Sequence, residues 1–291
     1  MKRYFESSMI ALFTLLAFTA CKEDEQGVAP GGDGAPHVAI YQSTVQEPYD
    51  ADNDLALRLA VNQQTENVYY LAEKTADKEA RAMSDAEYAE YVVANGTEGK
   101  LVADQQNSGK YADVVATGMK GDYTITAVAV GAGKKTSTKI LFSGPNWMDV
   151  ATGTYNFCEK AQQRLGVEEK KTGVLFQKLE SDPTLYRFKN LYGFGASLLL
   201  RLTDKTGEDQ NDKLQFFRVE AQTTPFTFSS YGTVSVRDLG YWQEDDSYAF
   251  DPGTGCFMYT TGNYKGVVVL GLQFFVTAGS LGYGWDEFYP E

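Results

Sequence analysis

The sequence contains a single histidine, His37, and this scarcity excludes several kinds of chemistry. Ser-His-Asp and Cys-His catalysis both need a histidine base that a folded scaffold holds in place. A histidine-rich zinc or iron site needs several such ligands. His37 follows Pro36 at the end of a Gly- and Pro-rich segment, where no rigid scaffold is expected. We therefore expect a non-enzymatic protein with no cofactor.

Positive charge is also scarce. The chain has 26 Lys and Arg residues against 39 Asp and Glu residues, which gives a formal net charge of −13. An acidic surface repels nucleic acid and the head groups of anionic lipids. The charge balance therefore argues against nucleic acid as a partner.

Long apolar runs are missing beyond residue 20, so no transmembrane helix is expected there. Residues 1–20 read MKRYFESSMIALFTLLAFTA, in which a basic start at Lys2 and Arg3 precedes an apolar run that ends at Phe18. This run is shorter than the roughly 17–25 residues that a spanning helix needs, which is typical of a signal peptide. We predict that residues 1–20 are an export signal.

The end of this signal, Phe18-Thr19-Ala20-Cys21, resembles a bacterial lipoprotein cleavage box: a bulky apolar residue, two small residues and a cysteine. The resemblance implies that Cys21 is lipidated and becomes the N-terminus. The alternative is an ordinary secretory leader with a cysteine just beyond the cut. A single acyl chain anchors only marginally, whereas several chains on one cysteine hold firmly. The membrane is therefore an expected partner, through the lipid anchor.

The acidic segment that follows, Lys22-Glu23-Asp24-Glu25, resembles the signal that Bacteroidota lipoproteins use to reach the cell exterior. The resemblance implies a lipid-anchored protein of the bacterial outer membrane that faces the exterior, and a plain solvated tether is the alternative. Residues 21–36 are rich in charged, Gly and Pro residues and hold few large apolar side chains. We predict that they form a flexible tether.

Residues 37–143 are predicted to form a first β domain, because short segments such as HVAIYQSTV and LALRLAVNQ alternate apolar and polar residues. Ser84 and Glu87 form a capping-box pattern that predicts a helix over 84–95. Around Tyr123, the segment GDYTITAVAV resembles the last strands of a fibronectin type III domain, in which a tyrosine packs at a corner. The resemblance implies a fibronectin III/Ig-like β-sandwich with one short helical insertion.

Residues 144–291 are predicted to form a second all-β domain, a β-sandwich or a barrel, and residues 146–291 show no obvious helix. Strand-like segments are expected at 153–158, 172–179, 184–191, 195–203, 213–220, 232–238, 255–260 and 265–276. The pieces LYRFKNLYGFGASLLLRL, YGTVSVRDLGYW, SYAFDPGTGCFMY and VTAGSLGYGWDEFYPE resemble the C-terminal domains of uncharacterised gut Bacteroidota surface lipoproteins. That family is largely uncharacterised, so the resemblance implies location and architecture only.

Two cysteines follow Cys21, namely Cys158 and Cys256. An exported protein permits a disulfide between them. Two buried free thiols fit the sequence equally well, and the spacing does not decide between the two states.

Two acidic stretches are candidates for chemistry. Asp50, Asp52 and Asp54 alternate as at the start of a calcium loop, but Leu55 and Val61 stand where an EF-hand requires Gly and Glu. We favour a solvated turn there and predict no metal. The second stretch is Glu244-Asp245-Asp246 with Asp251. Paired carboxylates could make a glycoside hydrolase, but a polar hairpin end is the favoured interpretation.

Aromatic residues give the strongest functional signal, because several lie near glycines or turns. They are Tyr192, Tyr231, Tyr241, Trp242, Tyr283, Trp285 and Tyr289. A large ring with a polar tip suits a shallow binding surface, although ordinary packing is the default for any single ring. Tyr231, Tyr241, Trp242, Tyr283 and Trp285 are the predicted ligand-binding residues. We expect a cell-surface binding protein for polysaccharide; the alternative is a structural or adhesive protein that binds other outer-membrane proteins.

Overall fold

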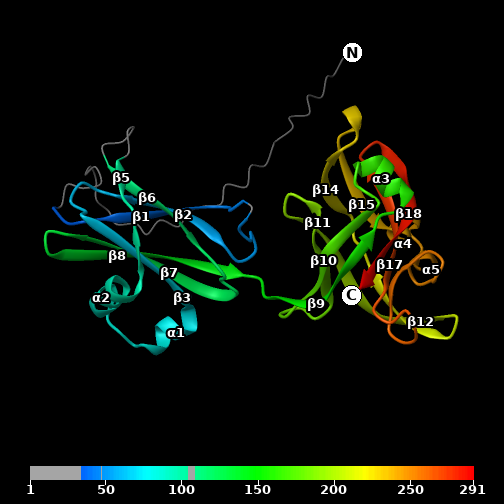
Figure 1. Cartoon of the computed structure of the whole chain (residues 1–291), viewed down its shortest axis with the longest axis horizontal. Helices are drawn as coiled ribbons and strands as arrows, with labels where there is room; N and C mark the ends of the chain where they lie inside the picture. The colour runs from blue at the N-terminus through cyan, green and yellow to red at the C-terminus, as the bar shows by residue number, and fades with distance from the viewer. Residues whose placement is uncertain (1–33, 47, 104–108) are drawn as a thin grey trace, which may run out of the picture.

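The structure is a computed structural model that describes residues 34–46, 48–103 and 109–291 (Figure 1). The predicted signal peptide (1–20), the lipidation site Cys21 and the export signal Lys22, Glu23, Asp24 and Glu25 lie outside the described residues. Strands dominate the fold, which confirms the all-β class. Figure 1 shows two lobes, one built from β1 to β8 and the other from β9 to β18. No helix in the described part of the chain is long and apolar enough to cross a membrane.

The first lobe consists of two antiparallel four-stranded sheets that share one core. One sheet has the order β1 (Val38–Ser43), β2 (Leu55–Val61), β6 (Lys110–Ala116), β5 (Val102–Ala103). The other has the order β4 (Thr97–Gly99), β3 (Asn67–Lys74), β7 (Gly121–Gly131), β8 (Lys134–Gly144). Alternate residues of β2 are buried, as the period of a strand requires, and they pack with Val68 and Ile125 from the facing sheet.

Helix α2 (Asp85–Asn95) confirms the helix predicted over 84–95. The Ser84 hydroxyl accepts from the Glu87 backbone N–H at 3.4 Å, and the Glu87 carboxylate accepts from the Ser84 N–H at 2.9 Å. One face of α2 packs on the outer side of β3 and β7. The sequence does not predict the preceding helix, α1 (Thr75–Ala80), because α1 has no side-chain cap and buries no residue.

The second lobe is a closed barrel of eight antiparallel strands. Its strands are, in order around the barrel, β9 (Trp147–Asn156), β10 (Lys170–Leu179), β11 (Leu185–Gly193), β12 (Ala196–Asp209), β13 (Asp212–Arg218), β16 (Cys256–Tyr259), β17 (Val268–Val276) and β18 (Gly279–Pro290). Strand β18 pairs with both β17 and β9 and so closes the ring. Of the two architectures predicted for this part of the chain, the barrel is the one observed.

A hairpin of two further strands, β14 (Gln222–Thr227) and β15 (Thr233–Asp238), is attached to the barrel through β17. Strand β17 is long enough to pair with β16 over its first residues and with β15 over its later ones. Its opposite edge pairs with β18 along its whole length. The hairpin therefore extends the barrel wall along β17, on the edge that also carries β16 and opposite β18.

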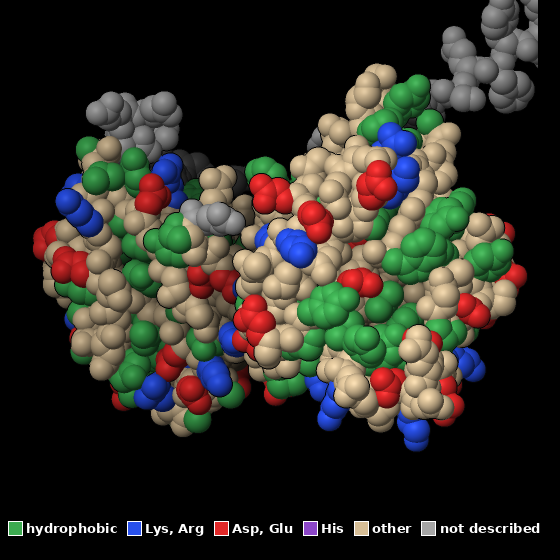
Figure 2. Space-filling view, turned by 45° about the vertical axis from the view of Figure 1, so that its right-hand side comes forward, with side chains coloured by type: hydrophobic (Ala, Val, Ile, Leu, Met, Phe, Trp, Pro, Cys, Tyr) green, Lys and Arg blue, Asp and Glu red, His purple; other side chains and the backbone are tan. Residues whose placement is uncertain are grey.

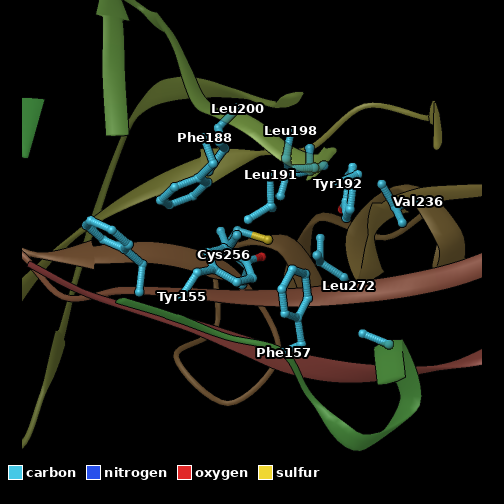
Figure 3. Packing of buried hydrophobic residues seen from close by; sticks show 14 of the residues in the cluster. Tyr155, Phe157, Phe188, Leu191, Tyr192, Leu198, Leu200, Val236, Cys256 and Leu272 are labelled. Atoms are coloured by element: carbon cyan, nitrogen blue, oxygen red, sulfur yellow. The ribbon is translucent and has the colours of Figure 1, made fainter. Parts of the chain in front are cut away.

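Aromatic and aliphatic side chains fill the barrel, as expected for a barrel of this size. The Phe188 ring lies 5.1 Å from that of Tyr155 and 4.8 Å from that of Phe176. Figure 3 shows Leu191, Leu198 and the neighbouring side chains converging from several strands. The interior is therefore a packed core, and the candidate binding residues must lie on the outer face.

The prediction that residues 146–291 lack helices is wrong. Three short helices are present, α3 (Glu159–Leu165), α4 (Leu239–Gln243) and α5 (Asp246–Ala249), together with the 3₁₀ turn η1 (Ser229–Tyr231). The α-helices start at side-chain caps: the Cys158 sulfur and the carboxylates of Asp238 and Asp245 each accept from a backbone N–H of the first turn. Helices of this length show too little periodicity to be recognised from the sequence.

The sequence also does not predict β14 or β18. Gly279, Gly282 and Gly284 break up the apolar pattern of β18, and glycine is a weak strand former. Tyr283, Trp285 and Tyr289, which the sequence analysis placed near turns, lie inside this strand. Gly284 is required there, because a side chain at this position would meet the sulfur of Cys158 at 2.5 Å.

Candidate functional site

Three aromatic residues lie together on the outside of the barrel. Residues of β18 alternate between its two faces, so Tyr283 and Trp285 point outward while Gly284 and Asp286 are buried. The side chains of Tyr283 and Trp285 are 47% and 41% exposed, and their ring centroids are 5.6 Å apart. Trp242 of α4 is half-buried, and its ring lies 5.6 Å from that of Tyr283. We call Trp242, Tyr283 and Trp285 the aromatic surface.

A buried carboxylate holds Trp242 in this position. Asp238 ends β15 and caps α4, accepting from the Tyr241 N–H at 2.7 Å and from the Val219 N–H at 2.8 Å. The Arg218 guanidinium donates to the same carboxylate at 2.8 Å, which supplies its counter-charge. These contacts fix the start of α4, so the indole is presented from a rigid turn. Rigid aromatic side chains lose little entropy on binding a ligand.

The hydrophobic side chains of this lobe are not evenly spread. Figure 2 shows them gathered in broad patches on the barrel side of the molecule, with acidic and basic side chains around them. Exposed hydrophobic patches rimmed by polar groups are typical of binding surfaces. The outer face of the barrel is therefore suited to contact with a ligand or partner.

A polar row runs from β15 across β17 to the aromatic surface. Arg237 lies directly opposite Gln273, and Gln273 lies directly opposite Tyr283. The Arg237 Nε donates to the Gln273 side-chain oxygen at 2.7 Å, and the guanidinium lies 4.6 Å from the ring centroid of Phe275. Arg237 and Gln273 are not among the binding residues predicted from the sequence. Arg237 alternates with the buried Val236 and Asp238 of β15, and this pattern could have indicated its outward face. Gln273 is itself buried within β17, so no such signal marks it.

No protein-family model matches the chain, and no curated protein matches it. The function of the aromatic surface is therefore inferred from its own geometry and chemistry.

The other two predicted ligand-binding residues lie apart from the aromatic surface. The Tyr241 ring packs on the Arg218 guanidinium, with its centroid 3.9 Å from the guanidinium carbon. Tyr231 stacks on Phe228 at the tip of the β14–β15 hairpin. Tyr192, also singled out by the sequence analysis, is buried inside the barrel. Tyr289 shares the outer face of β18, where its hydroxyl donates to Glu287 at 2.8 Å.

The acidic loop of Asp50, Asp52 and Asp54 joins the two lobes. Asp50 pairs with Lys189 at 2.7 Å and Asp52 pairs with Arg187 at 2.5 Å, both cations coming from β11. Asp54 accepts from the backbone N–H groups of Asp50 and Gly118. Nowhere in the described ranges do three or more His, Cys, Asp or Glu side chains form a group that could hold a metal. The carboxylates that resembled a calcium loop instead face protein cations.

These cations also affect the acidity of the loop. Burial opposes ionisation of Asp50, but hydrogen bonds from the Lys189 side chain and the Asp52 N–H outweigh it and lower the pKa of this carboxyl. The nearby charges of Lys189 and Arg187 act in the same direction. The Asp50 carboxylate therefore stays ionised and paired with Lys189 throughout the neutral pH range.

The second acidic stretch serves as helix caps and turns. Asp245 caps α5, and this hydrogen bond from the Ser247 backbone N–H lowers the pKa of its carboxyl. Asp246 pairs with Arg218 at 3.2 Å, and Asp251 accepts from the Gly253 N–H at 2.7 Å. Asp245, Asp246 and Asp251 thus act in a helix cap, an ion pair and a turn, in keeping with the polar hairpin end that the sequence favoured.

Cys158 and Cys256 are both free thiols, so the disulfide that the sequence allowed is not formed. Cys158 caps α3 through its sulfur, and Cys256 lies inside the barrel on β16. Burial, followed by the charge of Asp286, raises the pKa of Cys158 to about 12. Burial likewise raises the pKa of Cys256. Both thiols therefore stay protonated and serve the packing of the barrel.

Proposed function

We propose that this protein is a lipid-anchored, non-enzymatic binding protein of the bacterial outer surface, and that it binds glycans on the aromatic surface. The observation that supports glycan binding is the cluster of Trp242, Tyr283 and Trp285 on the outside of the barrel. The Tyr283 ring lies 5.6 Å from the Trp242 ring and 5.6 Å from the Trp285 ring. Sugar rings present apolar C–H faces that stack on such side chains. Polar groups beside the rings then hydrogen-bond the sugar hydroxyls.

The first prediction tests the aromatic surface directly. Replacement of Trp285 by Ala, or of Trp242 by Ala, is expected to weaken glycan binding about tenfold, because each change removes one stacked ring. Affinity gels and glycan arrays with the purified protein measure the binding. Tyr41→Ala is the matched control, since Tyr41 is an exposed aromatic on β1 in the other lobe.

Two results would overturn the glycan proposal: binding to no glycan at all, or unchanged binding in both tryptophan variants. A different result would support an adhesive function. The unmodified protein would then bind no sugar but would recover an outer-membrane protein in a pull-down, and the two tryptophan variants would not recover it.

We further propose that residues 37–143 form a fibronectin III-like spacer and residues 144–291 a separate binding domain. In support, the sheet orders β1-β2-β6-β5 and β4-β3-β7-β8 follow the immunoglobulin-type arrangement of two sheets. Helices α1 and α2 form an insertion between β3 and β4. No strand of one lobe pairs with a strand of the other among the described residues.

The second prediction concerns the export signal that we propose at the N-terminus. Replacing Glu23, Asp24 and Glu25 together with Ala is expected to reduce digestion by protease added to intact cells, because the protein would stay on the inner leaflet. Cys21→Ala is the control for anchoring, and it should abolish incorporation of labelled fatty acid. If the triple variant is digested as readily as the unmodified protein, residues 22–25 act only as a tether.

A further inference from the structure

Arg237 differs from most arginines of this chain in having no acidic partner. Five arginines pair with a carboxylate at 2.5–3.2 Å; they are Arg58, Arg81, Arg187, Arg201 and Arg218. Among the described residues no carboxylate lies within ion-pair distance of Arg237. In a chain with a net charge of −13, an unpaired and half-buried cation is unexpected.

The Arg237 guanidinium is nevertheless held in place. Its Nε donates to the Gln273 side chain at 2.7 Å, and its central carbon lies over the Phe275 ring, 4.6 Å from the ring centroid. No hydrogen bond or ion pair within the described ranges engages its two Nη groups. A guanidinium fixed through Nε and one face keeps the Nη edge for an oxyanion, which it binds in bidentate fashion.

This cation lies beside the aromatic surface. Arg237, Gln273 and Tyr283 are directly opposite one another on three neighbouring strands. Tyr283 is exposed and Arg237 is half-buried, whereas Gln273 between them is buried beneath its contact with Arg237. Neighbouring strands are about 4.8 Å apart, so Arg237 and Tyr283 are about 10 Å apart along the sheet. A single saccharide chain lying across the strands can therefore contact both.

We propose that the aromatic surface takes an anionic saccharide, whose carboxylate or sulfate group binds the Nη edge of Arg237 while its sugar rings stack on Tyr283 and Trp285. This proposal rests on the glycan-binding function proposed above and names the class of glycan. The anion supplies the counter-charge that Arg237 lacks within the chain. The acidic remainder of the protein disfavours binding of such a polymer elsewhere.

The third prediction compares saccharides that differ only in charge. The protein is expected to bind polygalacturonic acid or dextran sulfate at least tenfold more tightly than fully methyl-esterified polygalacturonate or dextran. Tighter binding of polygalacturonic acid than of its methyl ester indicates carboxylate recognition. Tighter binding of dextran sulfate than of dextran indicates sulfate recognition. Binding should weaken as sodium chloride is raised, because the contact is ionic.

Variants of Arg237 complete the test. Arg237→Gln should reduce binding of the acidic polymer about tenfold or more and leave any binding of the neutral polymer unchanged. Arg237→Lys should keep part of the affinity, because it retains the charge but loses the planar edge. Arg58→Gln, which disrupts an ion pair on the other lobe, is the control. Thermal unfolding of each variant verifies that it is folded.

The outcomes separate this inference from the function on which it rests. Equal binding of acidic and neutral polymers, with no effect of Arg237→Gln, would overturn the anionic class and leave glycan binding standing. Binding of neither kind of polymer, or of any other glycan, would overturn both.

Discussion

The free energy of unfolding of this protein should fall as the pH rises from 5 to 8, and Asp286→Asn should abolish most of that fall. Asp286 lies on β18 with its side chain inside the barrel and no exposed surface. Its carboxylate accepts from the Tyr155 hydroxyl and from the Cys158 backbone N–H, both at 2.9 Å. Among the described residues no Lys, Arg or His forms an ion pair with it.

Burial dominates the acidity of this group. It raises the pKa of Asp286 to about 6, against the opposing effect of the hydrogen bonds from Cys158 and Tyr155. The neighbouring groups Tyr192 and Cys158 have pKa values raised in turn by their burial, so they remain neutral over the physiological range. The shifted pKa of Asp286 therefore falls between pH 5 and 8, so this carboxyl changes its charge over that range.

The sign follows from proton linkage. Because the pKa of Asp286 is higher in the folded chain than in the unfolded chain, the folded state binds the proton more tightly, and the stabilisation is present at low pH. It is lost as the pH rises through about 6. The full effect is about 2–3 kcal/mol, of which about 1–1.5 kcal/mol falls between pH 5 and 8.

Denaturant unfolding at several pH values measures this effect. Asp286→Asn removes the titrating group while keeping its shape, so its profile should be nearly flat over the same range. Asp204→Asn is the matched control, because the Asp204 side chain is 88% exposed. A wild-type profile that is flat, or one whose slope survives in Asp286→Asn, would contradict this account.

The sequence allowed the individual elements of the first lobe to be predicted better than the assembly of the second. Ser84 and Glu87 are three residues apart, and a capping box within one turn is a local signal. Barrel closure depends on β18 pairing with β9, which joins Phe288 to Tyr155 across most of the lobe. Such a register is set by the whole barrel, so no local pattern reveals it.

The same distinction explains the candidate site. Trp242, Tyr283 and Trp285 were each predicted as ligand-binding residues, but only the α4 cap at Asp238 and the position of β18 in the barrel bring their rings together. The sequence gives no sign that Tyr241 turns instead toward Arg218. Residue type indicated the chemistry, and long-range pairing decided which residues act as a group.

The acidic loop is the clearest case of a long-range contact. Asp52 and its partner Arg187 are 135 positions apart in the sequence, so the loop pattern could only suggest a bound cation. The Arg187 side chain is 7% exposed and that of Asp52 is 23% exposed. Arg187 also donates to Gln177 and lies over the Trp147 ring at 4.2 Å, at the point where the chain enters the barrel. The half-buried Trp147 ring therefore packs against Arg187 at the junction between the lobes.

Removing the acid of this pair should have a large effect. Asp52→Ala leaves the Arg187 charge nearly buried without its counter-charge, and we expect it to reduce the free energy of unfolding by about 2 kcal/mol. Asp113→Ala is the matched control, because it breaks a salt bridge with Arg58 in which both side chains are more than half exposed. Exposed pairs contribute about 1 kcal/mol or less.

The same variant should loosen the junction between the lobes. Of the polar contacts that the described residues make near the junction, the pair of Asp50 with Lys189 and the hydrogen bond from the Asn53 amide to the Pro145 carbonyl would remain. The radius of gyration from small-angle X-ray scattering should therefore rise in Asp52→Ala and stay unchanged in Asp113→Ala. Adding Arg187→Met to Asp52→Ala should recover much of the lost stability, because no unpaired charge is then buried. Equal losses in Asp52→Ala and Asp113→Ala would show that the buried pair does not hold the lobes together.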